Sequence, residues 1–187
     1  AATLQLNFSG VQGNVQNNTF DGVDIGVLIA NDSGNLTVTG NTFKNITRGA
    51  SEIAAGSYGA GILLFSPAFQ GPVTISNNVF QNSDSGIRGS AAGGTIDANT
   101  VVTGNTFAGN VYNIVDKIAG TMTVSGTNVL DGTTLSSASD AQIYSMEDKI
   151  VDGVDVSGYG LVSLKAGNVY VTPNSFFTPG GTTTPSI

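Results

Sequence analysis

An asparagine followed two residues later by phenylalanine recurs along the chain, each time after a short stretch in which apolar and polar residues alternate. Copies end at Phe20, Phe43, Phe80 and Phe107, and a related segment ends at Leu130 after a one-residue insertion. The intervals between these positions are 23, 37, 27 and 23 residues. Intervals that share a minimum length and exceed it by irregular amounts predict a solenoid, in which surface loops vary in length while the coil does not.

Alternation with a period of two predicts strands with one buried face. In LTVT and VTIS, for example, the apolar Val38 and Ile75 alternate with threonine and serine. We expect the strands 36–39, 73–76, 101–103 and 122–125 to lie in one parallel sheet, with Val38, Ile75, Val102 and Val124 stacked inside. A second apolar stretch follows each turn, at 26–30, 61–65, 86–89 and 112–115. The pattern therefore predicts two strands per coil.

Stacked coils explain why the asparagine recurs. Coils that superimpose bring the repeated residue to the same bend, where its amide can bond to the asparagines of the neighbouring coils, as in other stacked-strand ladders. A turn-forming role alone accounts for one copy better than for four aligned copies. We therefore predict a structural ladder of Asn18, Asn41, Asn78 and Asn105.

Composition supports an all-β protein and excludes several partners. Only 10% of the 187 residues are charged, whereas 40% are hydrophobic and 26 are glycine. A polar surface of Thr, Ser and Asn favours strands over helices. The absence of cysteine excludes disulfides and thiolate metal sites. A net charge of −7 disfavours nucleic acid as a partner, and no stretch is apolar for long enough to insert into a membrane.

The remainder of the chain divides into three regions. Residues 1–135 are expected to hold the coils, with a large surface loop at 47–59. Residues 136–175 hold a helix within 137–153, with a cap at Ser139 and an end at Gly153, and then two strands within 160–172 around a turn at 165–168. We expect this region to complete or cap the solenoid, because a free strand edge promotes association. Residues 176–187 have the Pro, Gly and Thr composition of a linker.

The segments VTGNTF, VTISNNVFQNSDSGI and VVTGNTFAGNVYNI resemble the right-handed parallel β-helix of the pectin-lyase-like superfamily. The resemblance covers about residues 14–130 and implies an all-β, right-handed parallel β-helix of about five or six coils with one short C-terminal helix. It says little about function, because that superfamily contains lyases, hydrolases, epimerases, tailspikes and adhesins. The segment from MEDKIVDGVDV to GNVYVTPNSF is similar to junctions in large multi-domain bacterial surface proteins that contain several β-helical units. That likeness implies one unit of a longer exported polypeptide.

Residues suited to catalysis are scarce. The chain has no histidine and no thiol, so the common acid–base and triad arrangements are absent. The adjacent aspartates, His-Gly and Arg-x-Lys of polygalacturonase-like enzymes do not occur. Pectate-lyase-like enzymes need several acids around Ca²⁺ with a basic residue nearby, and only Arg48 and Arg88 are arginines here. We interpret Arg88 as a surface charge, and we expect no enzyme activity and no cofactor.

Two acidic groups remain as candidates for a metal. Asp21 and Asp24, in FDGVDIG, could form a Ca²⁺ site or a carboxylate dyad, or they could serve as turn and cap residues around Gly22. The densest acidic group is Glu147, Asp148, Asp152 and Asp155. Neighbouring residues of a helix point in different directions, so we interpret this group as a solvated helix end rather than one ligand set.

Outward positions form a second candidate ladder. Its members are Thr37, Thr39, Thr74, Ser76, Thr103, Thr123 and Ser125, with Val101 among them. Ice-binding solenoids use a flat Thr-x-Thr ladder, so ice binding is a minor functional alternative. Serine and threonine are also ordinary outward residues of a sheet with few charges.

These observations favour a non-catalytic structural or adhesive module of an exported bacterial protein, extracellular or on the cell surface and able to form fibres. The alternative is a carbohydrate-binding or polysaccharide-processing domain, with glycans as ligands. The segment Thr3–Phe8 alternates from the outset and has no cap in the sequence. We therefore expect it to pair with a neighbouring β-helix unit or, head to tail, with an identical subunit.

Overall fold

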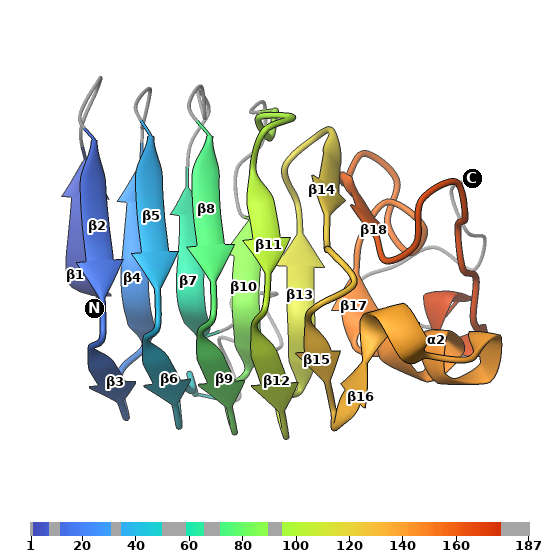
Figure 1. Cartoon of the computed structure of the whole chain (residues 1–187), viewed down its shortest axis with the longest axis horizontal. Helices are drawn as coiled ribbons and strands as arrows, with labels where there is room; N and C mark the ends of the chain where they lie inside the picture. Colours follow the sequence, from blue (N-terminus) through green and yellow to red (C-terminus); the bar gives the residue numbers. More distant parts are fainter. Residues whose placement is uncertain are drawn as a thin grey trace.

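The computed structural model describes residues 2–7, 12–30, 35–49, 59–65, 72–89 and 95–176. In this part the chain forms a parallel β-helix, whose coils stack along one axis from β1 to a cap at the C-terminal end (Figure 1). The strands belong to three long sheets, which we call A, B and C, and to one two-stranded sheet near the cap.

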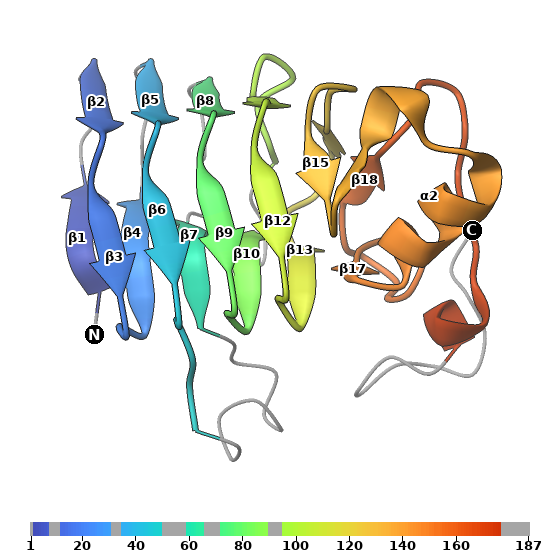
Figure 2. The ribbon, with the colours of Figure 1, turned by 60° about the horizontal axis from the view of Figure 1, so that its bottom comes forward.

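Along the regular coils, each long sheet takes one strand from every coil, as the turned view also shows (Figure 2). Sheet A contains β1 (Ala2–Asn7), β4 (Ile25–Ala30), β7 (Ala60–Phe65), β10 (Ser85–Gly89), β13 (Tyr112–Asp116) and β17 (Ile150–Val151). Sheet B contains β2 (Gly13–Gln16), β5 (Leu36–Thr39), β8 (Val73–Ser76) and β11 (Val101–Thr103). Sheet C contains β3 (Thr19–Asp21), β6 (Thr42–Lys44), β9 (Val79–Gln81), β12 (Thr106–Ala108), β15 (Val129–Leu130) and β16 (Thr133–Thr134).

The regular coils have three strands, not the two expected from sequence. The bend at the repeated asparagine divides what looked like one strand into a sheet B strand and a short sheet C strand centred on the phenylalanine. The prediction that the strand at 122–125 belongs to sheet B is also wrong in part. Strand β14 (Thr121–Thr123) pairs with β18 (Leu161–Ser163), and a single isolated bridge between Val102 and Val124 links this segment to the backbone of sheet B.

Stacked phenylalanines fill the interior along sheet C. The rings of Phe20, Phe43, Phe80 and Phe107 follow one another at centroid distances of 4.9, 5.0 and 4.9 Å. This column requires glycine in sheet A. A Cβ on Gly61 would lie 2.7 Å from the Phe80 ring and 2.7 Å from the carbonyl oxygen of Gly86. Gly26, Gly61 and Gly86, which begin three of the apolar runs, therefore make room for the aromatic column.

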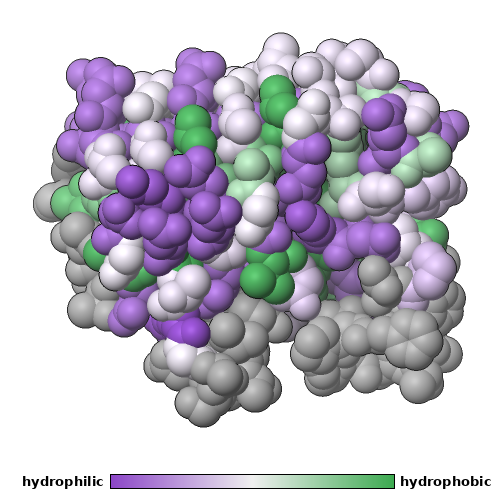
Figure 3. All heavy atoms as spheres, turned by 90° about the horizontal axis from the view of Figure 1, so that it is seen from below, coloured by the Kyte–Doolittle hydropathy of each residue, from purple (hydrophilic) through white to green (hydrophobic). Residues whose placement is uncertain are grey.

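The apolar core continues from the coils into the cap. It extends from Val15 to Tyr170 and includes the inward Val38, Ile75, Val102 and Val124 that the alternation predicts. On the face formed by sheet C, hydrophobic residues are scattered singly among hydrophilic ones (Figure 3). Such scattering is normal for a soluble surface.

The helix is shorter than the sequence suggests. Helix α2 (Asp140–Glu147) begins with the expected capping box between Ser139 and Gln142. It ends six residues before Gly153, because Ile150 leaves the helix for β17 and pairs with Ile114 of the preceding coil. Burial against a parallel strand thus outweighs the helical spacing of Ile143, Met146 and Ile150.

The region after β18 also differs from expectation. The turn at 165–168 is present, since the Asn168 N–H donates to the Lys165 carbonyl at 3.1 Å. The second expected strand is absent: residues 169–172 form none, and Tyr170 packs edge-on against Tyr144 of α2. Most of the predicted loop at 47–59, namely 50–58, and residues 177–187 of the predicted linker lie outside the described residues.

Candidate functional site

The repeated asparagines form one hydrogen-bonded ladder along the bend between sheets B and C. The backbone N–H and the side-chain Nδ2 of Asn41 both donate to Oδ1 of Asn78, at 2.9 and 3.0 Å. Asn78 bonds in the same way to Asn105, and Asn18 to Asn41. Nδ2 of Asn78 also donates to the carbonyl of Val38 in the preceding coil, at 2.9 Å. The amides therefore join each coil to both of its neighbours.

The ladder has a fifth member that the sequence analysis missed. Asn105 donates from N and Nδ2 to Oδ1 of Asn128, at 2.9 and 3.1 Å. The repeat ending at Leu130 carries a one-residue insertion, yet Asn128 stands two residues before Leu130, as the asparagine does in every other copy. Asn41, Asn78, Asn105 and Asn128 are buried, whereas Asn18 is exposed.

The outward hydroxyl ladder is present but irregular. Thr37 aligns with Thr74 and Val101, and Thr39 aligns with Ser76 and Thr103. Hydroxyls of the second row bond to one another: Ser76 donates to Thr39 at 3.0 Å, and Ser125 donates to Thr103 at 2.6 Å. Thr123 lies in β14 and pairs with Ser163. Val101, 40% exposed, interrupts the first row, so the rows present no unbroken array of threonines.

Of the metal candidates, Asp21 is the last residue of β3 and Asp24 directly precedes β4, and Asp21 is already engaged. Its Oδ1 accepts a hydrogen bond from Nδ2 of Asn45 at 2.8 Å, and its Oδ2 lies 3.2 Å from Nζ of Lys44. These two contacts lower the pKa of Asp21. Within the described residues, no three acidic, histidine or cysteine side chains gather closely enough to hold a metal ion.

A buried group of carboxyls lies where the last coils meet the cap, and we call it the acidic cluster. It consists of Asp116 at the end of β13, Glu147 at the end of α2, and Asp152 and Asp155 after β17. Their exposed fractions are 0, 4, 1 and 4%. The interpretation of residues 147–155 as a solvated helix end is therefore wrong for three acids, and only Asp148 is exposed. Arg88, at 8% exposed, is likewise not a surface charge.

Backbone amides satisfy part of the acidic cluster. Asp152 accepts from the N–H groups of Val154 and Val162 at 2.8 and 2.7 Å, and Asp155 accepts from the N–H of Asp152 at 3.0 Å. In the described part of the chain, Oδ2 of Asp116 and Oε1 of Glu147 have no hydrogen-bond partner. Two lysines of this end pair with other acids, Lys149 with Asp131 at 3.1 Å and Lys165 with Asp140 at 3.8 Å.

Burial shifts the proton affinities of these carboxyls upward. It raises the pKa of Glu147 to about 9, and the charges of Asp152, Asp155 and Asp148 act in the same direction. It raises the pKa of Asp116 to about 7 and that of Asp152 to about 6, although backbone N–H groups oppose the shift in both. The pKa of Asp155 is also raised by burial. At pH 7 Glu147 is therefore protonated while Asp152 is largely ionised.

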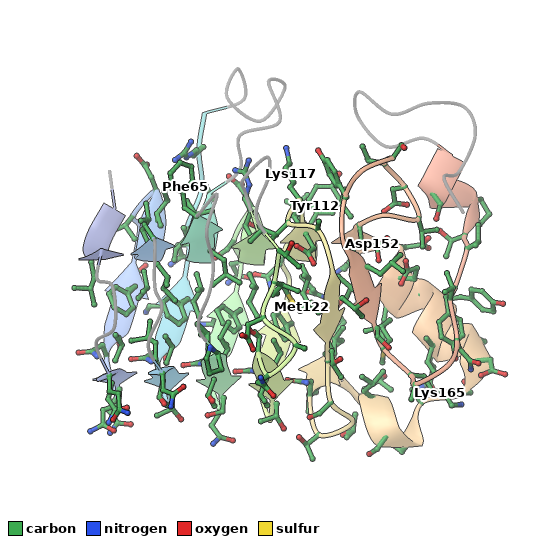
Figure 4. The ribbon with its side chains drawn as sticks, turned by 90° about the horizontal axis from the view of Figure 1, so that it is seen from above. Phe65, Tyr112, Lys117, Met122, Asp152 and Lys165 are labelled. Atoms are coloured by element: carbon green, nitrogen blue, oxygen red, sulfur yellow. The ribbon has the colours of Figure 1, made fainter. Side chains whose placement is uncertain are left out.

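A cavity of about 300 Å³ adjoins the acidic cluster. Glu147, Asp152, Thr121, Ser163 and Tyr170 contribute to its wall. Asp152 lies beside the cap, away from the exposed Lys165 (Figure 4). The cavity thus combines a carboxylic acid, a carboxylate and hydroxyl groups. The only local signal was the apolar context of Asp152 and Asp155 in IVDGVDV, whereas their position beside Asp116 and Glu147 depends on long-range packing.

Comparisons with known proteins identify one family. Residues 6–176 match a family model described as "Periplasmic copper-binding protein (NosD)". Comparison with curated proteins and with solved structures gave no match. In the part of the chain that the structure describes, none of the helices is long and apolar enough to cross a membrane.

Proposed function

The chain belongs to the NosD family of right-handed parallel β-helices, and from this premise we propose that it is a non-catalytic structural module of an exported cell-envelope protein. The observation that carries the proposal is the use made of the polar residues inside the coils. Asn41, Asn78 and Asn105 all bond from coil to coil. In the described part of the coils these amides thus bond one coil to the next, which supports a structural role.

The family description names copper, and the residues of this chain do not fit copper. Cysteine, methionine and histidine are the side chains that bind copper well. The chain has no cysteine and no histidine, and its two methionines, Met122 and Met146, are 0 and 4% exposed in the apolar core. The described acidic residues form no group of three that could hold a metal. We therefore propose that this member of the family has a structural role and binds no copper.

Copper competition tests this part of the proposal. The untagged protein is mixed with Cu(I) and bicinchoninate, or with Cu(II) and nitrilotriacetate, and the copper that stays with the protein after gel filtration is measured. We expect the chelator to retain the metal in both cases, because thiolate, imidazole and accessible thioether ligands are absent. One copper per chain, lost in the Met122→Leu or Met146→Leu variant, would contradict the proposal.

A specific observation favours polysaccharide processing as a second candidate. Glu147 and Asp152 share one cavity and have pKa values of about 9 and about 6. Two carboxyls with separated pKa values are the pattern of an acid and a base in glycoside cleavage. However, both oxygens of Asp152 accept backbone hydrogen bonds of 2.7–2.8 Å that shape the turn after β17. This engagement supports a structural role for the pair.

An assay for polymer cleavage separates the two candidates. Pectate, alginate and neutral polysaccharides are incubated with the protein, with and without Ca²⁺, and reducing ends and unsaturated uronates are measured. We expect no release above the rate with heat-inactivated protein, because Asp152 is committed to Val154 and Val162. Release that disappears in Glu147→Gln but persists in Asp148→Asn would establish the second candidate instead.

A further inference from the structure

The cavity beside the acidic cluster has the composition of a small-molecule site. Its volume of about 300 Å³ leaves room for about ten atoms of the size of a water oxygen. Three segments of the cap contribute apolar side chains to its wall, namely Val154, Leu161, Val162, Val169 and Tyr170. Polar groups come from Glu147, Asp152, Thr121, Ser163 and Asn168. An apolar wall with a few polar groups is the usual form of a ligand pocket.

One polar atom of this wall lacks a partner. Glu147 is 4% exposed, and no donor in the described part of the chain reaches its Oε1. A buried carboxyl oxygen in this position costs free energy unless a further group supplies a hydrogen bond. Asp152 differs, since its oxygens accept the N–H groups of Val154 and Val162. The polar end of a ligand would therefore lie next to Glu147.

The charges that act on Glu147 all have one sign. They belong to Asp148 beside it and to Asp152 and Asp155 after β17, and Asp152 acts in the same way on Asp116 of β13. The lysines that follow α2 and β18 already pair with other acids. A ligand with a positive charge is therefore favoured over a neutral or negative one.

A primary ammonium group fits both requirements. It carries one positive charge and three N–H donors, so it can bond to Oε1 of Glu147 and also balance the neighbouring carboxylates. A metal ion fits less well, because the described acids form no group of three that could hold one. The apolar part of the wall, which includes the ring of Tyr170, can contact the hydrocarbon part of an amine.

We propose that this cavity binds a small primary amine, whose ammonium group donates a hydrogen bond to Glu147 and whose apolar body packs beside Val169 and Tyr170. The site goes beyond the structural-module function and does not depend on it. The neutral carboxyl of Glu147 ionises when the ammonium binds, and its proton passes to the solvent. Binding therefore exchanges one proton for one amine.

The pH dependence follows from this exchange. Burial and the neighbouring carboxylates raise the pKa of Glu147 to about 9, so the free protein holds the proton at pH 7 and the complex does not. Binding is therefore expected to strengthen as the pH rises. The other titratable groups on the surrounding elements have contacts of their own: Lys149 with Asp131, Lys165 with Asp140, Lys117 with Tyr159, and Tyr144 with Tyr170.

Isothermal titration calorimetry with benzylamine tests the site. The full chain is titrated at pH 7 in phosphate and in HEPES, whose ionisation enthalpies differ and so reveal the protons released. We expect a dissociation constant on the order of 1 mM or tighter, with release of about one proton per amine. Affinity is expected to increase about tenfold per pH unit between pH 6 and pH 8. Absence of saturable binding, or binding without proton release, would overturn the proposal.

Two control ligands separate charge from hydrogen bonding. Benzyl alcohol keeps the ring but has no charge, and benzyltrimethylammonium keeps the charge but has no N–H donor. We expect both to bind at least about tenfold more weakly than benzylamine, because neither combines a charge with donors to Oε1 of Glu147. Equal affinity for the alcohol would show an apolar cavity without recognition of a cation. Equal affinity for the quaternary ion would show that no hydrogen bond to Glu147 forms. Either result contradicts the proposal.

Glu147→Gln tests the residue that receives the ammonium. The variant keeps the size of the side chain but cannot ionise, so we expect at least about tenfold weaker binding and no proton release. Asp148→Asn is the matched control, because Asp148 is the exposed neighbour, and its affinity is expected to stay within about twofold of the wild type. Unchanged affinity in Glu147→Gln would overturn the assignment.

Val169→Trp tests the location without a change in the acidic cluster. Val169 contributes to the cavity wall and is 54% exposed, so a larger side chain there can fill the cavity while the core stays intact. We expect benzylamine binding to be lost and the circular dichroism spectrum to be retained. Binding that persists in this variant would place the amine elsewhere and overturn the proposal. None of these results bears on the structural-module function, which is judged by copper retention and polymer cleavage.

Discussion

Raising the pH from 5 to 9 is expected to destabilise the native protein by several kcal/mol, and Glu147→Gln is expected to remove most of this loss. Burial of a carboxyl without a cation favours its neutral form, so the native state binds protons more tightly than the unfolded chain does. A tenfold change in proton affinity is worth about 1.4 kcal/mol, so the rise in the pKa of Glu147 from 4.5 to about 9 corresponds to on the order of 6 kcal/mol.

The direction follows from the raised values. Below about pH 4 these carboxyls are protonated in both states, and their contribution to stability is fully present. As the pH rises, the unfolded chain releases its protons first, and stability is lost until the native groups ionise. For Asp152, Asp116 and Glu147 these limits lie near pH 6, 7 and 9. The window of loss therefore extends from about pH 4 to about pH 9.

Urea unfolding at pH 5, 7 and 9 measures the effect. In Glu147→Gln the side chain keeps its size and stays neutral, so the free energy of unfolding is expected to vary much less with pH. Asp148→Asn is the matched control, because Asp148 is the exposed neighbour of Glu147 and its loss leaves the buried carboxyls in place. If the stability of the wild-type protein is constant or increases from pH 5 to pH 9, Glu147 is either exposed or paired with a cation in the native state.

Asn78→Leu is expected to lower the free energy of unfolding by about 3–4 kcal/mol, the second large effect. The side chain is 1% exposed, and its Oδ1 receives both the N–H and the Nδ2 of Asn41. Its own Nδ2 donates to Asn105 and to the carbonyl of Val38. A leucine there leaves several buried polar groups without partners, and each costs about 1–3 kcal/mol in part offset by the added apolar surface.

Asn18→Leu is the matched control for this change. Asn18 occupies the same bend of the same ladder, but it is exposed and its Oδ1 has no donor in the described part of the chain. Its replacement is expected to cost less than about 1 kcal/mol, because water can satisfy the groups that it leaves. Thermal and urea unfolding of both variants give the comparison. Equal losses in the two variants would show that position along the ladder, and hence burial of the amide, is irrelevant.

The sequence by itself determined the solenoid, because the same pattern of strand and bend recurs in each copy of the repeat. The alternation around Val38, Ile75 and Val102 and the asparagine at each bend agree in copy after copy, and only stacked parallel coils satisfy them together. The capping box could also be predicted, since its two partners, Ser139 and Gln142, are three residues apart. Features that depend on residues close together in the sequence were therefore predictable.

Only the tertiary structure decided what happens where the repetition ends. Ile150 has the spacing of a helical residue, yet it pairs with Ile114 because an open strand of sheet A lies next to it. Asp116 and Asp152 are 36 residues apart and come together with Glu147 only after the last coil and α2 fold against each other. Burial and charge at such a site depend on long-range packing, which no local pattern encodes. The direction of the asparagine ladder is likewise a property of the stacked coils, because the same amide can donate toward either neighbour until the whole row is formed.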